Sequence, residues 1–149
     1  MMGEERNIVY LYCDGACRGN PGPGGWGVLL RYNGHECRLY GGVSNTTNNQ
    51  MEITAAIEGL KALKRCCHVI VTTDSQYLRR GVMEWLAVWE GRQWKTSNKK
   101  PVKNRALWEG LKSEVGRHTI IWHWVKGHSG HVENEIADQL ANFGIDEIL

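Results

Sequence analysis

The sequence predicts an α/β protein built on a five-stranded mixed sheet, with three antiparallel strands followed by parallel strands, and with helices flanking the sheet. Strand-like apolar runs open the chain, and from residue 47 onward such runs alternate with segments of helical periodicity. The chain has 149 residues, the length of one ordinary domain. We therefore expect a single domain that spans residues 1–149.

The first three strands form a predicted antiparallel meander. Residues 7–13 are an apolar, β-branched run, and we expect a buried strand that carries Asp14 at its C-terminal end. Residues 19–25 are rich in glycine and proline and predict a turn before the second strand. The pair Asn33-Gly34 then predicts a tight hairpin into the third strand.

A helix is predicted directly after this meander. Thr47 and Gln50 have the spacing of a capping box, and the apolar pattern continues to about Lys64. Glu52 would lie in the first turn of the helix, where a carboxylate interacts favourably with the helix dipole, so a purely structural role is the alternative for this residue taken alone. The expected apolar face consists of Met51, Ala55, Leu60 and Leu63.

The second half of the chain supplies the parallel strands. Residues 68–75 follow a helix and predict a strand parallel to the first, which brings Asp74 to the same sheet edge as Asp14. This edge is where α/β sheets bind ligands. Residues 117–125 predict the fifth strand, and a last helix carries Asp138. The apolar positions of that helix recur at helical spacing: Val132, Ile136, Leu140 and Phe143.

Charge is unevenly distributed along the chain. The formal net charge is only +2, but residues 79–105 hold eight basic and two acidic residues, a local charge of +6, and the remainder carries −4. A basic block of this density in a small protein usually contacts a polyanion. We expect residues 79–105 to form a basic helical handle.

The cysteines and the N-terminal sequence favour a cytoplasmic protein. The five cysteines form no CxxC pair, which argues against a disulfide framework or a structural zinc site. The N-terminal segment is polar, and no apolar stretch is long enough to span a bilayer, so we expect neither a secretory signal nor a membrane partner. Nothing in the sequence requires a dimer, and we expect a monomer.

Several spaced motifs together resemble one protein family. They are, in chain order, DG with GNPGPGGWG, TTNNQME, TDSQY, WKT with KKPVKN, WVKGHSGH and ENEIADQLA. In this order, over nearly the whole chain, they resemble bacterial ribonuclease H of type 1. The resemblance implies the ribonuclease H-like fold and an endonuclease that uses Mg²⁺, or Mn²⁺ in its place. Such enzymes hydrolyse the RNA strand of RNA–DNA hybrids and leave 5′-phosphate and 3′-hydroxyl ends.

The same resemblance implies the catalytic residues. Asp14, Glu52, Asp74 and Asp138 resemble the four metal-binding carboxylates of the family, and His128 resembles its mobile catalytic histidine. Carboxylates suit Mg²⁺, and two ions can activate the attacking water and stabilise the leaving oxygen. Asp14 and Asp74, from strand ends, are expected to bridge both ions. The glycines around His128 would let its loop deliver a proton to the 3′ oxygen or help the product to depart, although a loop histidine taken alone is more often a surface residue.

Candidate substrate contacts lie beside the acids and in the handle. The 2′-hydroxyl distinguishes RNA from DNA. The candidates to recognise it are backbone groups of residues 15–19 together with Cys17, Asn48 and Gln76, and Glu52 could also accept a hydrogen bond from it. Asn20 and Thr47 resemble the family's pocket for a DNA phosphate, with turn formation and helix capping as their alternative roles. The handle residues expected to contact the duplex are Trp85, Arg92, Lys95, Lys99 and Lys100.

Some residues depart from the family pattern or have a structural alternative. Trp89 and Trp108 fit a small core within the handle as well as a substrate contact. Gln50 stands where some relatives carry arginine, which puts one phosphate contact in doubt. The handle also contains three residues that make it less uniformly basic: Glu84, Glu90 and Gly91.

Two other functions stay open from the sequence. If the four carboxylates did not converge, the chain would be a hybrid-binding module that does not cut. DNA-directed nucleases and strand-transfer enzymes share this type of sheet and acidic site. The WKT and KKPVKN motifs and the small size of the chain weigh against this second alternative.

Overall fold

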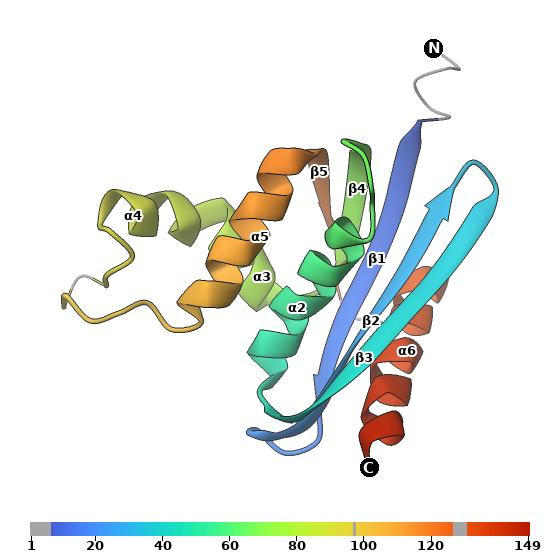
Figure 1. Ribbon diagram of the computed structural model, residues 1–149, viewed down its shortest axis with the longest axis horizontal. Coiled ribbons are helices and arrows are strands. Elements are labelled where there is room, and N and C mark those ends of the chain that lie inside the picture. Colours follow the sequence, from blue (N-terminus) through green and yellow to red (C-terminus); the bar gives the residue numbers. More distant parts are fainter. Residues whose placement is uncertain (1–6, 97, 127–130) are drawn as a thin grey trace.

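A mixed five-stranded sheet in the order β3-β2-β1-β4-β5 organises the molecule (Figure 1). The computed structural model describes residues 7–96, 98–126 and 131–149. β1 pairs antiparallel with β2, and β2 with β3, whereas β4 is parallel to β1 and β5 is parallel to β4. The predicted fold class is therefore confirmed. The strands are β1 Ile8–Cys17, β2 Gly22–Tyr32, β3 His35–Thr46, β4 His68–Thr73 and β5 Thr119–Trp124.

The meander follows the prediction at one turn and departs from it at the other. Asn33 and Gly34 both have positive φ, 53° and 81°, as a two-residue hairpin requires. The glycine-rich segment is mostly strand rather than turn, because β2 begins at Gly22. Its glycines are needed for packing: a Cβ at Gly25 or Gly27 would collide with backbone atoms of the last helix.

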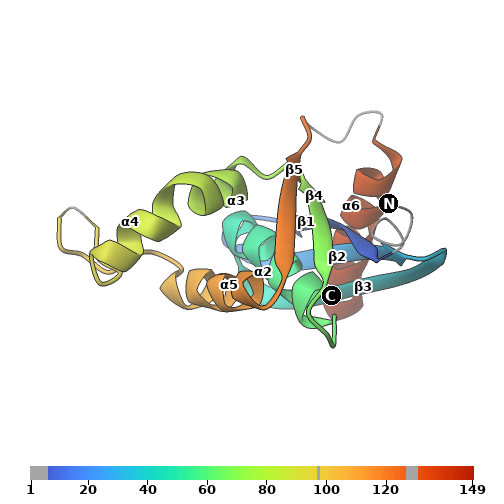
Figure 2. The ribbon, with the colours of Figure 1, turned by 90° about the horizontal axis from the view of Figure 1, so that it is seen from above.

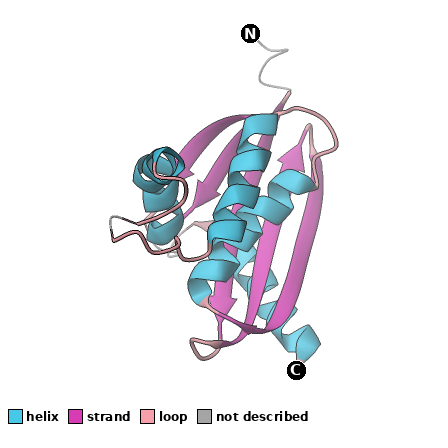
Figure 3. Ribbon diagram, turned by 60° about the vertical axis from the view of Figure 1, so that its left-hand side comes forward, coloured by secondary structure: helices cyan, strands magenta, loops and turns pink. Residues whose placement is uncertain are grey.

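Two helices cover one face of the sheet and a third covers the other. α2 (Asn48–Lys61) and α5 (Arg105–Arg117) pack on one side, and α6 (Val132–Ile148) lies behind β1, β2 and β3 (Figures 2 and 3). Thr47 caps α2 as predicted, accepting a hydrogen bond of 3.2 Å from the Gln50 N–H. The main core lies between the sheet and α2 and α5, and includes Leu11, Val28, Ile53, Leu60, Trp108 and Leu111.

The buried face of α6 differs from the predicted one. Val132 and Phe143 are 61% and 51% exposed, and Ile136 and Leu140 are only half-buried. The small residues one position away carry the contact, because α6 approaches the glycines of β2 and β3 so closely that large side chains do not fit. The buried residues of α6 are Asn134, Ala137, Ala141, Gly144 and Ile145.

The basic segment projects away from the sheet, as Figures 1 and 2 show for α4. Its helical part runs through α3 (Gln76–Arg80), a π-helical turn η1 (Gly81–Trp85) and α4 (Leu86–Gly91). The prediction of a helix across residues 79–105 is only half right, because the chain from residue 92 to α5 is not helical. Within the described ranges, no helix is both long enough and apolar enough to cross a membrane.

Candidate metal centre and nucleic-acid interface

Three carboxylates converge at one edge of the sheet. Asp14, Glu52 and Asp74 each offer an oxygen, and these oxygens lie within 4.8 Å of one another. The parallel pairing of β1 with β4 ends at Tyr12 and Thr72, so Asp14 and Asp74 both follow the last paired residues of adjacent strands. β1 continues beyond this point against β2 alone, and Asp14 therefore lies within a strand rather than at its end.

Glu52 reaches the cluster from α2. It is the fifth residue of the helix and lies outside the first turn, so the helix dipole does not explain it. Its Oε1 accepts a hydrogen bond of 2.6 Å from the N–H of Gly15, the residue that follows Asp14. Glu52 also accepts a hydrogen bond from Ser75. Glu52 is 7% exposed, and its carboxylate is held by one residue within β1 and one that follows β4.

Ser75 is a further residue of the site, one for which no role was predicted from the sequence. It is buried, and its hydroxyl accepts the N–H of Leu78 at 3.0 Å, which caps α3. The same side chain hydrogen-bonds to Glu52, so one residue fixes both the start of the handle and a carboxylate of the cluster. A serine between Asp74 and a helical run is the available signal, since serine is a preferred N-cap residue.

Asp138 joins the cluster from the opposite layer. It projects from α6 and lies within hydrogen-bonding distance of Asp14. The structure thus brings Asp14, Glu52 and Asp74 together, and Asp138 adjoins Asp14 from the helix on the opposite face of the sheet. Asp138 is half-buried, whereas Asp14 is only 3% exposed.

The electrostatics of the cluster favour protons or cations. Burial, followed by the negative charges of Glu52 and Asp74, raises the pKa of Asp14 to about 10. Burial also raises the pKa of Glu52 to about 7, against the opposing hydrogen bonds from Ser75, Asp14 and Gly15. A site that takes up protons this readily gains even more from a bound cation, which would compensate several charges at once. The all-carboxylate donor set fits a hard divalent ion such as Mg²⁺.

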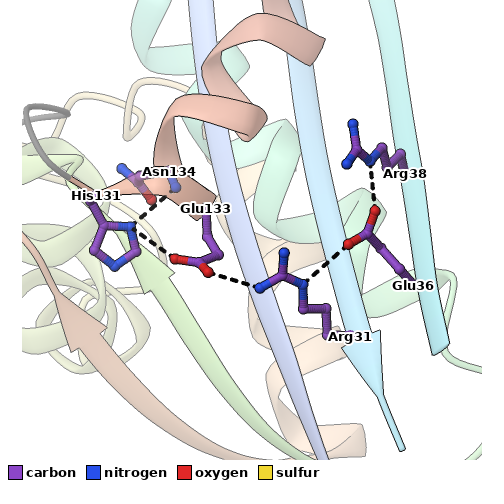
Figure 4. Close-up of polar contacts among 6 residues, drawn as sticks. All are labelled: Arg31, Glu36, Arg38, His131, Glu133 and Asn134. Atoms are coloured by element: carbon purple, nitrogen blue, oxygen red, sulfur yellow. Dashed lines mark hydrogen bonds and ion pairs between the residues drawn. The ribbon is translucent and has the colours of Figure 1, made fainter. Parts of the chain in front are cut away.

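The N-terminus of α6 is anchored to the sheet by a chain of ion pairs (Figure 4). Glu133 pairs with Arg31 of β2 at 2.8 Å, and Arg31 pairs with Glu36 of β3 at 3.2 Å. His131 caps the helix by accepting the Asn134 N–H at its Nδ1, 3.1 Å away. These contacts set the position of the helix that carries Asp138. The predicted catalytic residue His128 lies outside the described residues.

Several predicted substrate contacts gather at the start of α2. The side-chain oxygen of Asn20 accepts the backbone N–H of Asn48 at 3.2 Å, and Thr47 caps the helix. The thiol of Cys17 donates to the backbone carbonyl of Thr46 at 3.4 Å. Asn20, Cys17 and the helix start are thus adjacent, at a point where helix N–H groups favour anions. The capping and turn roles of Thr47 and Asn20 are both present.

The handle contains both packing and exposed residues. Trp108 is fully buried and donates from Nε1 to the Tyr77 hydroxyl at 3.2 Å, so it belongs to the core. Trp85 and Trp89 are half-buried and pack against Trp108. Four residues beyond α4 line an open depression of about 590 Å³ on the surface. They are Arg92, Lys95, Thr96 and Lys99, of which all but Thr96 are exposed, and Lys100 and Gln76 are also exposed.

Two residues that depart from the family pattern, Gln50 and Glu90, form contacts with other parts of the protein. Gln50 accepts a hydrogen bond from Thr46 at 2.7 Å and donates to Asn104 at 3.1 Å, which ties α2 to the base of the handle. Glu90 forms an ion pair with Lys112 of α5. The acidic residue therefore fastens α4 to the body as well as lowering the charge of the handle.

Known proteins match this chain in sequence and in structure. The family model described as RNase H matches residues 6–146. A curated ribonuclease H of Coxiella burnetii is 78% identical over 149 residues, all of this chain and 97% of the relative. The crystal structure of LC9-RNase H1, described as a type 1 RNase H with the type 2 active-site motif, is 35% identical. It has a TM-score of 0.84 over 95% of this chain and 73% of that chain.

A second solved structure shares the fold. LC11-RNase H1, crystallised in complex with an RNA/DNA hybrid, has a TM-score of 0.72 at 23% identity and covers 94% of this chain and 98% of that chain.

Proposed function

The chain belongs to the RNase H family, and from this premise we propose that it is an endoribonuclease that hydrolyses the RNA strand of RNA–DNA hybrids by two-metal-ion catalysis. The products would be a 5′-phosphate and a 3′-hydroxyl. The observation that supports this proposal is the convergence of Asp14, Glu52 and Asp74 within 4.8 Å, with Asp138 beside Asp14. Four carboxylates in one place have no evident packing role and suit divalent ions.

The chain's own residues would have distinct tasks in the reaction. Asp14, on β1, and Asp74, directly after β4, would hold both ions, while Glu52 and Asp138 would each help to hold one of them. When bound, two Mg²⁺ ions, or Mn²⁺ in their place, would supply activation of the attacking water and neutralisation of the charge on the scissile phosphate. His128 would transfer a proton to the departing 3′ oxygen.

The hybrid would be recognised on both strands. Cys17, Asn48 and Gln76 are proposed to approach the 2′-hydroxyl of the RNA strand, since they adjoin the carboxylates in the sequence. Asn20 and Thr47, beside the start of α2, would hold a phosphate of the DNA strand. The complex of LC11-RNase H1 with a hybrid supports this class of substrate.

The handle would bind the duplex outside the reaction centre. Its exposed basic residues are suited to phosphate contacts, and Trp85, half-buried, would offer an aromatic edge at its base. The proposed contacts are Trp85, Arg92, Lys95, Lys99 and Lys100.

Cleavage of labelled duplexes tests this function. With Mg²⁺ we expect cleavage of the RNA strand of a hybrid, none after EDTA, and none with Asp14→Asn or Asp74→Asn, while both variants still bind the hybrid. Binding without cleavage by the parent protein would favour the hybrid-binding module. Cutting of a matched DNA duplex at a comparable rate would favour a DNA-directed nuclease.

The remaining expectations concern the state of the protein in the cell. A monomer in the cytoplasm stays the prediction. Size-exclusion chromatography with light scattering and cell fractionation test these two points separately.

A further inference from the structure

Asp138, on α6, lies outside the group of three carboxylates whose oxygens are within 4.8 Å of one another. Asp14, Glu52 and Asp74 form a tight set, but Asp138 is half-buried and arrives from the opposite face of the sheet. A carboxylate on a helix surface has several accessible rotamers, and each would aim its oxygens differently. A neighbouring donor that selects one rotamer would therefore affect metal binding.

Asn142 provides such a donor one turn further along α6. Its side-chain Nδ2 donates to the backbone carbonyl of Asp138 at 3.1 Å and lies 3.5 Å from Oδ1 of the same residue. A single amide group thus contacts both the main chain and the carboxylate of Asp138. The second contact is long, which is consistent with a weak orienting force rather than a strong bond.

Arg18 fixes which way the Asn142 amide faces. Its Nη2 lies 3.4 Å from Oδ1 of Asn142 and 3.5 Å from the Asn142 backbone carbonyl. A guanidinium can only donate hydrogen bonds, so the amide oxygen must face Arg18 and the amide nitrogen must face Asp138. Nη1 of Arg18 pairs with Asp146 at 2.7 Å, which holds the guanidinium over α6.

We propose that Asn142 is a positioning residue that orients the Asp138 carboxylate toward the metal centre, and that Arg18 orients Asn142. The proposal rests on the proposed role of Asp138 as a metal ligand. We call the contacts from Arg18 through Asn142 to Asp138 the relay. Because Arg18 directly follows β1, the relay connects the end of the strand that carries Asp14 to α6, the helix that carries Asp138. Groups that orient a ligand from outside the coordination sphere typically change metal affinity by about 10- to 100-fold.

Mn²⁺ binding without hybrid tests the relay. Asn142→Leu keeps the approximate size of the side chain and removes the donor, and we expect its Kd for Mn²⁺, measured by calorimetry, to rise about tenfold, the lower end of that range because the relay is partly exposed. Asn142→Gln retains an amide that can still reach Asp138, and its Kd for Mn²⁺ should stay within about threefold of the parent value. The Kd of Arg18→Met should lie between those of Asn142→Leu and Asn142→Gln.

A matched control and a second readout separate positioning from folding. Gln139→Leu makes the same kind of substitution at an exposed position of α6 and should leave the Kd unchanged. In hybrid cleavage, Asn142→Leu should lower kcat and leave KM near the parent value. Should Asn142→Leu fail to fold, Arg18→Met still tests the proposal without a substitution inside α6.

The outcomes distinguish this inference from the proposed function. A parent protein that cleaves hybrids, with Asn142→Leu and Arg18→Met both matching its Mn²⁺ affinity, would overturn the relay alone. A parent that neither cleaves nor binds Mn²⁺ would overturn the function and the relay with it.

Discussion

The backbone N–H of Gly15 donates a hydrogen bond of 2.6 Å to the Glu52 carboxylate, and this bond joins α2 to β1 directly beside Asp14. The approach is possible because residue 15 has no side chain. A Cβ there would lie 2.5 Å from the Glu52 backbone nitrogen and 2.5 Å from the Met51 carbonyl carbon. The distance between two of the four carboxylates therefore depends on one glycine.

Gly15→Ala should separate α2 from β1. We expect a loss of about 3 kcal/mol in the free energy of unfolding, measured by urea denaturation, because the neighbouring atoms belong to the backbone and cannot give way easily. Hybrid cleavage should fall at least about tenfold. Gly116→Ala is the control, because nothing lies within 4 Å of its added Cβ, and it should stabilise α5 by roughly 0.5–1 kcal/mol. Equal stability of the two variants would contradict the packing proposed at Gly15.

Stability of the metal-free protein should fall as the pH rises. The folded-state pKa values of Asp14 and Glu52 are raised, to about 10 and about 7, from ordinary values of 3.8 and 4.5. Between its ordinary and its raised pKa each group binds more protons in the folded state than in the unfolded one, so the free energy of unfolding decreases with pH. For each group the slope is at most about 1.4 kcal/mol per pH unit. The Glu52 contribution should change from about pH 4.5 to 7, and that of Asp14 should continue above it.

Denaturation in EDTA between pH 5 and 8 measures this effect. The free energy of unfolding of Asp14→Asn should decline less with rising pH than that of the parent. In the absence of EDTA, added Mg²⁺ should stabilise the parent more at pH 8 than at pH 5, because protons and cations compete for the same oxygens. An identical pH profile for Asp14→Asn would show that Asp14 does not contribute the expected proton uptake.

Two handle lysines should control the salt dependence of hybrid binding. Lys99 and Lys100 are exposed beyond α4, and each phosphate contact contributes a slope of about −0.9 in log K against log salt. Lys99→Ala with Lys100→Ala should weaken binding and flatten the slope by about one to two units, measured by fluorescence anisotropy. The double variant Lys61→Ala, Lys64→Ala removes the same charge from exposed positions outside the handle. This control variant should change the salt slope less than the handle variant does. If Lys99→Ala with Lys100→Ala left the slope unchanged, these two lysines would not contact the phosphates of the hybrid.

Trp108 and Trp85 should have different roles despite their contact. Trp108 is fully buried beneath Gly81, and Trp108→Ala should cost about 3–5 kcal/mol of stability. Trp85 is half-buried, and Trp85→Ala should cost less stability but weaken hybrid binding measurably. Thermal denaturation and anisotropy, measured on both variants, separate the effects. A Trp85→Ala protein that binds the hybrid with the parent's affinity would leave Trp85 as a packing residue.

The sequence by itself determined the strand order of the meander and the Thr47 cap, because these depend on local turn and capping patterns. It predicted the parallel strand before Asp74 from the helix that precedes that strand, and the four acids from motifs that resemble those of a known family. Only the tertiary structure decided which face of α6 is buried. Its apolar pattern indicated Val132 and Phe143, but the glycines of β2 and β3 admit only the small face of the helix.

The geometry of the metal centre was likewise decided by tertiary contacts. Local patterns identify Glu52 as a helix residue, but its position depends on a hydrogen bond to Gly15, 37 residues away. Ser75 and the pair of Arg18 with Asn142 also act across elements that are distant in the chain. Such contacts exist only after the layers pack, since the interaction energy between two side chains depends on their distance in space and not on their separation in sequence.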